Sequence, residues 1–116
     1  MPPTADQRAK RRDAYLRSTY GVTEQEYQML LRLQQGVCWI CHRPPKARRL
    51  SVDHRHTKGE RKLPTEQRRK LIRANVRGLL CSFCNRGLQV FRDKAELFSR
   101  AAQYLTTWPA KEVISE

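Results

Sequence analysis

Four cysteines arranged as two pairs are the first residues of this sequence whose types and spacing could do chemistry. Cys38 and Cys41 form one Cys-x-x-Cys pair, and Cys81 and Cys84 form the other. A gap of two residues lets one tight turn present two thiolates to the same point, and two such turns complete a tetrahedral zinc site. The spacing therefore predicts one structural Zn²⁺. A redox pair is the alternative, but it requires a surrounding βαβ pattern that this chain lacks.

The run Asp-His-Arg-His at residues 53–56 is the second candidate for chemistry. A closed four-thiolate zinc site leaves no open coordination position, so catalysis is expected elsewhere in the chain. The Asp53 carboxylate is a hard ligand suited to Mg²⁺, and neighbouring residues of a strand point in opposite directions. His54 could therefore act as a general base beside a metal ligand. Taken alone, these residues also fit an ordinary polar surface.

Two helices are predicted ahead of these groups. A basic helix is expected over residues 6–17, and Thr23 with Glu26 has the spacing of a capping box that starts a second helix. Gly36 is placed to end that helix in a left-handed conformation. The core-facing side of the second helix is expected to carry Tyr27, Leu30, Leu31 and Gln34.

Two short strands are predicted to position the Asp-His run. Alternation over residues 50–52 indicates a strand that delivers Asp53 at its end, and residues 74–80 resemble a second strand. Between them, residues 57–73 are polar and strongly basic, with one short helix expected near Pro64. A further helix should begin within the second cysteine pair, which places Asn85 in its first turn.

A last helix is signalled by Asp93 and Glu96 and should end at Trp108, because Pro109 follows. Its apolar side is expected to carry Leu97, Phe98, Ala101, Tyr104 and Leu105. The sequence predicts three parts: a basic arm or helix over residues 1–22, one zinc-stapled domain over 23–109, and a tail over 110–116.

The charge of the chain indicates a polyanionic partner. Among 116 residues there are 24 Lys and Arg against 11 Asp and Glu, which gives a net charge of +13 and an isoelectric point of about 10.4. This excess favours nucleic acid. No apolar run is long enough to span a membrane, and the first residues lack the apolar stretch of a secretory signal. Paired cysteines in such a chain favour metal over disulfides, so we expect a reducing cytoplasm and no membrane partner.

The order of motifs resembles the phage recombination endonuclease VII family of His-Me finger (HNH-like) nucleases. The resemblance is carried by YGVT at 20–23, EY at 26–27, QGVCWIC at 35–41, VDHRH at 52–56, VRGLLCSFCN at 76–85 and YL at 104–105. It implies an α+β fold, in which a zinc-bound ββα-metal (His-Me) finger is flanked by helices.

The resemblance also implies roles for individual residues. Asp53 and Asn85 would hold one catalytic Mg²⁺ or Mn²⁺, His54 would take a proton from the attacking water, and His56 would position the phosphate or the metal. Arg77 is a candidate for assisting the metal. Arg55 departs from the family pattern, because relatives often carry an acidic residue between the two histidines.

The second departure from the family pattern is the segment 57–73, where relatives often have a short turn. Its basic side chains predict an additional clamp on DNA phosphates. The candidate DNA-binding residues are Lys58, Arg61, Lys62, Arg68, Arg69, Lys70, Arg73 and, on the following strand, Arg77.

The predicted function is metal-dependent hydrolysis of DNA phosphodiester bonds, to the 5′-phosphate and 3′-hydroxyl ends that the resemblance implies. The substrate could be duplex or branched DNA, and the protein could be a homodimer or a monomer. One alternative is a non-catalytic zinc-ribbon DNA-binding protein. Another keeps the nuclease but gives it a task in nicking, DNA packaging or host defence. The resemblance points to a phage-encoded protein that works in the host cell.

Overall fold

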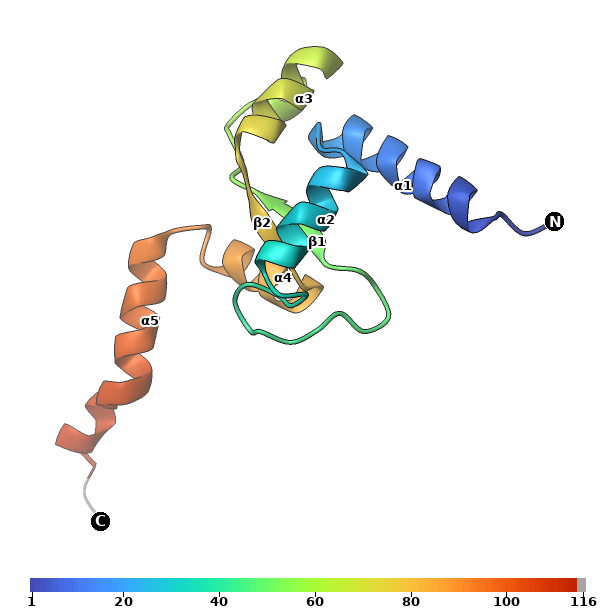
Figure 1. Ribbon diagram of the computed structural model, residues 1–116. Coiled ribbons are helices and arrows are strands. Elements are labelled where there is room, and N and C mark those ends of the chain that lie inside the picture. Colours follow the sequence, from blue (N-terminus) through green and yellow to red (C-terminus); the bar gives the residue numbers. More distant parts are fainter. Residues whose placement is uncertain (115–116) are drawn as a thin grey trace. The chain divides into compact units, whose positions relative to one another are not determined.

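The computed structural model describes residues 1–114, and the chain divides into two compact units, Met1–Asn85 and Arg86–Glu116 (Figure 1). The first unit contains helices α1 (Ala5–Tyr20), α2 (Glu24–Leu33) and α3 (Thr65–Ala74), strands β1 (Ser51–His54) and β2 (Val76–Leu80), and the 3₁₀ turn η1 (Glu60–Lys62). Helix α4 (Ser82–Val90) begins in the first unit and ends in the second, which also contains α5 (Ala95–Thr107) and η2 (Pro109–Glu112). These helices and the small sheet confirm the predicted α+β class. The predicted boundaries at residues 22 and 109 stay predictions.

The two strands form an antiparallel pair whose register is interrupted at the end of β1. Asp53 lies opposite Gly78, but the next residue, His54, lies opposite Val76. Arg77 is therefore the extra residue of a β-bulge in β2. A bulge bends its strand and redirects the side chain of the extra residue, which brings Arg77 to the end of β1 that carries the candidate catalytic residues.

The buried side chain of Gln34 completes the hydrogen bonding of β2. Its Nε2 donates to the carbonyl of Leu79 at 2.9 Å, and its Oε1 accepts from the Leu79 N–H at 2.8 Å. A Cβ on Gly78 would lie 3.1 Å from Gln34 Oε1. The side chain of Gln34 thus satisfies both backbone groups of a fully buried residue, as a third strand would do.

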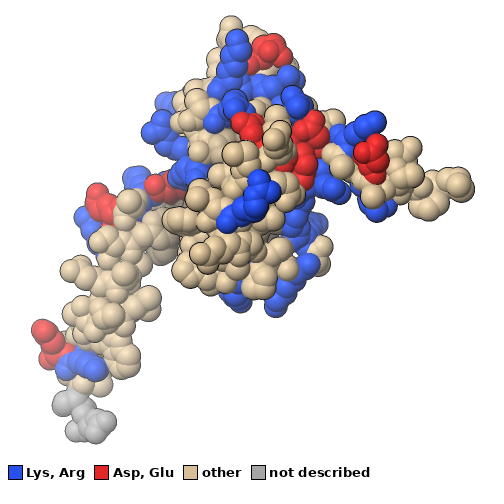
Figure 2. All heavy atoms as spheres, in the orientation of Figure 1, with Lys and Arg blue, Asp and Glu red and all other residues tan. Residues whose placement is uncertain are grey.

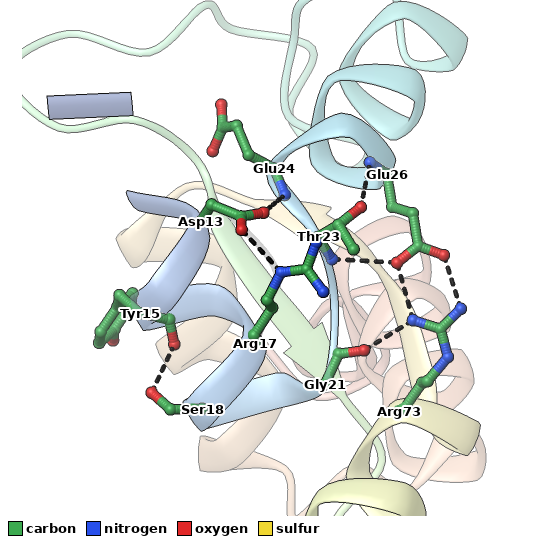
Figure 3. Close-up of polar contacts among 9 residues, drawn as sticks. All are labelled: Asp13, Tyr15, Arg17, Ser18, Gly21, Thr23, Glu24, Glu26 and Arg73. Carbon is green, nitrogen blue, oxygen red and sulfur yellow. Dashed lines mark hydrogen bonds and ion pairs between the residues drawn. The ribbon is translucent and has the colours of Figure 1, made fainter. Parts of the chain in front are cut away.

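A network of hydrogen bonds joins α3 to the corner between α1 and α2 (Figure 3). The predicted capping box is present: Thr23 Oγ1 accepts from the Glu26 N–H, and Glu26 Oε1 accepts from the Thr23 N–H, each at 3.0 Å. Arg73 of α3 donates to both oxygens of Glu26 at 2.7 and 2.6 Å and to the carbonyl of Gly21 at 2.6 Å. Gly21 has φ +70°, and a Cβ there would lie 2.9 Å from the Arg69 carbonyl oxygen. The corner therefore requires glycine for both its conformation and its contact with α3.

A second carboxylate links α1 to α2 at the same corner. Asp13 accepts from the Glu24 N–H at 2.8 Å and from Arg17 at 2.6 Å (Figure 3). These bonds hold the pKa of Asp13 below its ordinary value, the Glu24 N–H having the largest effect. The first N–H of α2 is thereby capped by a residue of α1.

The apolar core of the first unit lies between the helices and the sheet. Tyr27 is buried, and its hydroxyl donates to the Leu50 carbonyl at 2.6 Å. On the predicted core side of α2, Tyr27 and Gln34 are buried whereas Leu30 and Leu31 are half-buried. The other buried apolar side chains are Leu16, Val22, Leu50, Val52, Ile72, Leu79 and Leu80.

The second unit contains the predicted last helix. Trp108 has φ +50° and ends α5, as expected from Pro109. On the predicted apolar side, Leu97, Phe98 and Ala101 are half-buried, and the rings of Phe91 and Phe98 meet edge to face. Tyr104 and Leu105 are exposed. The predicted tail includes part of η2, and residues 115–116 lie outside the described residues. None of the described helices has the length and apolar character needed to cross a membrane.

Candidate active site

The four cysteines converge at one point in the structure. Their Sγ atoms all lie within 4.8 Å of one another, and the Sγ atoms of Cys41 and Cys81 are 3.9 Å apart. A tetrahedral zinc ion with Zn–S bonds of about 2.3 Å requires sulfur atoms about 3.8 Å apart. Cys38 and Cys84 are buried, and the other two are half-buried. The predicted cluster is thus confirmed as a group that could hold zinc.

Local backbone hydrogen bonds form the two turns that present these sulfurs. The Cys38 N–H donates to the carbonyl of Arg43, and the His42 N–H donates to the carbonyl of Cys38, each at 3.0 Å. In the second pair, the Cys84 N–H points at Cys81 Sγ at 3.4 Å as α4 begins. These hydrogen bonds shape the two turns from which the four sulfurs converge.

The electrostatics of the cluster favour a bound cation. The pKa of Cys41 is lowered to about 6, mainly because its sulfur accepts from the Arg43 N–H. The pKa of Cys84 is raised to about 12 by burial, with the nearby thiols adding to the effect. Four sulfurs this close cannot all ionise unless a positive ion balances them. Zn²⁺ would supply that charge and keep every ligand as a thiolate.

His54 and His56 come together at the end of β1, and an acidic residue joins them. Their ring centroids are 4.4 Å apart, and His54 Nε2 lies 3.1 Å from Glu60 Oε2. The other oxygen of Glu60 accepts from the Thr57 N–H at 2.6 Å. Burial opposes ionisation of Glu60, but the Thr57 N–H and His54 outweigh it and hold the pKa of Glu60 below its ordinary value. The carboxylate of Glu60 is therefore fixed against the imidazole of His54.

Asp53 lies next to His54 in the chain but has a different partner. Arg77 Nε donates to one carboxylate oxygen of Asp53 at 2.7 Å, and its Nη2 donates to the other at 3.1 Å. Only 8% of the Asp53 side chain is exposed. A buried carboxylate needs such a cationic partner. Arg77 occupies one acceptor position on each oxygen, so a divalent cation at Asp53 would bind at the remaining lone pairs or displace one of these bonds.

Asn85 lies in the first turn of α4, as the sequence predicts, and is half-buried. Its backbone N–H donates to the carbonyl of Cys81 at 2.9 Å. Among the described residues, no hydrogen bond joins its side chain to Asp53. Its role as a metal ligand stays a prediction.

The basic residues of the segment 57–73 differ in how they are engaged. Arg73 forms the ion pair with Glu26, and Arg69 pairs with Glu66 at 3.1 Å. Arg55, just before this segment, donates to Asn75 Oδ1 at 3.0 Å. Besides Arg73, the exposed basic side chains of the segment are Lys58, Arg61, Lys62 and Lys70. Figure 2 shows groups of Lys and Arg side chains spread over the visible surface of the part that holds the sheet and helices α1 to α3, with fewer Asp and Glu among them.

The chain is similar to known proteins over most of its length. The model of the family described as recombination endonuclease VII matches residues 13–107. The chain belongs to the recombination endonuclease VII family. Among curated relatives, the Gene 59 protein of Mycobacterium phage L5 is 43% identical over 101 residues, and that of Mycobacterium phage D29 is 41% identical over 101 residues. Each alignment covers 85% of this chain and 52% of the relative, so the chain spans about half the length of these relatives. No solved structure matches the chain.

In this member of the endonuclease VII family, Glu60 is the residue of the site that sequence reasoning missed. The sequence carried a signal for it, because Glu60 and Glu66 are the two acidic residues in an otherwise basic segment. An acidic residue in such a basic segment indicates a specific contact, and for Glu60 that contact is with His54. The remaining predicted roles, for Asp53, His54, His56 and Asn85, stay predictions.

Proposed function

We propose that this chain is a metal-dependent endonuclease that hydrolyses phosphodiester bonds in DNA. The supporting observation is the end of β1, where Asp53 and His54 lie side by side and each is held by its own partner. Membership of the endonuclease VII family gives the general activity. The paired strands β1 and β2 followed by α4 support a ββα-metal finger, with zinc at the four cysteines as its structural ion.

His54 is the proposed general base. A carboxylate only accepts hydrogen bonds, so the proton of a neutral imidazole lies on Nε2, where it is shared with Glu60 Oε2. The lone pair is then on Nδ1, which can accept a proton from an attacking water. Glu60 thus fixes the orientation and the tautomer of the base.

Asp53 and Asn85 are the proposed holders of Mg²⁺ or Mn²⁺, because both offer oxygen donors. The ion would stabilise negative charge on the scissile phosphate and on the leaving 3′ oxygen. Arg77, released from part of its contact with Asp53, could donate to the same phosphate. His56, which is exposed and whose ring packs against that of His54, would contact the phosphate or the ion.

The proposed substrate is DNA, bound through its phosphates by exposed basic side chains of the segment 57–73. Net charge +13 supports this. Branched DNA is the proposed preferred form, and cleavage of both strands at a junction would call for two copies of the site in a homodimer. Because the relatives come from phages, we place this activity in the cytoplasm of an infected host cell.

The decisive experiment incubates the purified chain with linear, supercoiled and four-way-junction DNA, with and without Mg²⁺ or Mn²⁺. We expect divalent-dependent cleavage that leaves 5′-phosphates, and faster cleavage of the junction. His54→Ala is the control: it should bind DNA as the wild type does but lose cleavage. If the wild type cuts no substrate with any divalent ion, a non-catalytic zinc-ribbon DNA-binding protein becomes the better description.

A further inference from the structure

His54, His56 and Glu60 together form a group that the proposed mechanism uses only in part. Each offers one ligand atom, and these three atoms lie within 4.8 Å of one another. All three residues belong to the short stretch from the end of β1 to η1, so no distant part of the chain is needed to assemble them. Such a group is separate from the four-cysteine cluster, and Asp53 does not belong to it.

The distance between two of these ligands suits direct coordination. His54 Nε2 and Glu60 Oε2 are 3.1 Å apart. Two ligands at about 2.1 Å from one ion are about 3.0 Å apart at a right angle and about 3.4 Å apart in a tetrahedron. His54 and Glu60 are mostly buried, with 13% and 12% of their side chains exposed. His56 is exposed and can close the remaining gap by rotating its side chain.

The carboxylate is also oriented from behind, as metal-binding carboxylates usually are. The Thr57 N–H donates to the oxygen of Glu60 that does not face His54, at 2.6 Å. A ligand held by such an outer hydrogen bond loses less freedom on binding. Two imidazoles and one carboxylate select borderline transition metals such as Zn²⁺, Ni²⁺ and Co²⁺, whereas Mg²⁺ prefers oxygen ligands.

We infer that His54, His56 and Glu60 form a second metal site, specific for a borderline transition-metal ion, and that occupation of this site switches off cleavage. The inhibitory part of the inference rests on the proposed role of His54. An ion bound between Nε2 and Glu60 takes the place of the proton that they share. A neutral imidazole then carries its proton on Nδ1, the atom that would otherwise accept a proton from water, so the base is blocked.

The binding test uses the full chain loaded with one zinc and titrated with Ni²⁺ in a calorimeter. We expect one nickel ion to bind while the zinc content stays constant. Glu60→Gln and His56→Asn should each weaken nickel binding by about tenfold or more. Loss of a residue that only hydrogen-bonds to a metal ligand already weakens metal binding by about that factor, and these two residues are proposed as direct ligands. His56 is exposed, so its variant should fold if Glu60→Gln does not. Matched controls are Glu66→Gln, at an exposed acid of α3, and His42→Asn, at the remaining histidine of the chain.

Two results would overturn the site. The first is that Ni²⁺ does not bind the wild type in the micromolar to millimolar range, and the second is that Ni²⁺ binds both ligand variants as tightly as it binds the wild type.

The second test adds Ni²⁺ to the DNA cleavage reaction at a fixed concentration of Mg²⁺. We expect inhibition with a midpoint that matches the calorimetric Kd and that rises for His56→Asn, measured against that variant's own activity. Undiminished cleavage at saturating nickel would overturn the inhibition. If the wild type shows no Mg²⁺-dependent cleavage at all, the proposed function fails, whereas the calorimetry still decides the metal site.

Discussion

At the scale of single residues, two neighbouring side chains of β1 are held by partners from different segments. Asp53 pairs with Arg77, the bulge residue of β2, and His54 pairs with Glu60 of η1. Successive strand residues face opposite sides of the sheet, so the two pairs do not compete for the same space. The metal-binding step and the proton-transfer step that we propose can therefore be altered separately.

Exchanging Arg77 for alanine should make the protein unusually responsive to Mg²⁺. The substitution leaves the buried Asp53 carboxylate without these two hydrogen bonds, at a cost of about 1 to 3 kcal/mol. A divalent ion at Asp53 would restore the missing charge. Thermal melting with increasing Mg²⁺ should raise the Tm of Arg77→Ala more than that of the wild type. Arg61→Ala, at an exposed arginine, is the control, and an equal response of all three proteins would argue against a cation site at Asp53.

His54→Ala and Asp53→Ala should lose cleavage for different reasons. A positioned base contributes roughly 10²- to 10⁴-fold, and its loss lowers kcat without weakening DNA binding. Loss of a metal ligand weakens use of Mg²⁺ instead. Single-turnover cleavage measured against Mg²⁺ concentration should therefore recover partly for Asp53→Ala at high Mg²⁺ but not for His54→Ala. Recovery of both variants would mean that His54 is not the base.

At the scale of the elements, Arg73 makes the side-chain hydrogen bonds that join α3 to the α1–α2 corner. Arg73 reaches Gly21 and Glu26, and Glu26 is at the same time the reciprocal residue of the capping box. The N-terminus of α2 and the position of α3 thus depend on one carboxylate. Because α3 follows directly on η1, this contact also supports the segment that carries Glu60.

Removing the charge of Glu26 should destabilise the protein in a manner that depends on pH. The Arg73 guanidinium and the Thr23 N–H lower the pKa of Glu26 to about 2. The ionised form therefore contributes its full stability above the unfolded-state pKa of about 4.3, and this contribution fades as the pH falls from there toward 2. Urea unfolding should give a difference of about 1 kcal/mol between the wild type and Glu26→Gln at pH 7, modest because both partners are exposed.

The same difference should shrink between pH 5 and pH 3. Both proteins carry the same cysteine cluster, so any acid effect on that cluster cancels in the comparison. Arg73→Lys is a useful second variant, because a lysine cannot reproduce the two-pronged contact with the carboxylate. A difference that stays constant over this pH range would show that Glu26 acts only through packing.

Local signals in the sequence were sufficient to predict most elements but not the contacts between them. Thr23 with Glu26, and Pro64 before α3, mark helix starts through the chemistry of a few adjacent residues. The cysteine spacing likewise predicted a cluster, because a shared ligand sphere constrains distant pairs. Glu60 beside His54 and the bulge at Arg77 were not predicted, since each depends on how a long segment folds back on a strand. Arg73 is an example: its basic side chain predicts a contact with DNA, whereas in the structure it forms an ion pair with Glu26 of the same chain.

At the scale of the whole molecule, the four-cysteine cluster joins the two ends of the segment that carries Asp53, His54 and His56. Zinc binding at such a site contributes directly to the free energy of folding. Cys81→Ser should therefore lose zinc and several kcal/mol of stability. Elemental analysis should find one zinc per wild-type chain, and melting with a chelator should bring the wild type down to the level of the variant. A variant with a full zinc content and unaltered melting would contradict the four-sulfur site.

DNA affinity should depend strongly on salt, because cationic side chains release counterions from the phosphate backbone. Replacing the exposed Arg61, Lys62 and Lys70 together by alanine should reduce the slope of log K against log salt by up to about 3. Removal of three charges from the exposed face of α1, at Arg8, Lys10 and Arg11, gives a control of equal net charge. Equal slopes for the two triple variants would show that the segment 57–73 makes no special contact with DNA.

The position of the two cysteine pairs, at either end of residues 42–80, affects how easily this segment can gain sequence during evolution. With both pairs bound to one ion, residues 42–80 form a closed ring. The entropic cost of closing a ring rises only logarithmically with the number of residues in it. Doubling that number adds only about 0.6 kcal/mol to the cost. New sequence can therefore enter the ring at little cost to stability while the ends stay in place. A change within the segment 57–73 can therefore replace Glu60, the partner of His54, while the two cysteine pairs and their zinc ion keep their positions.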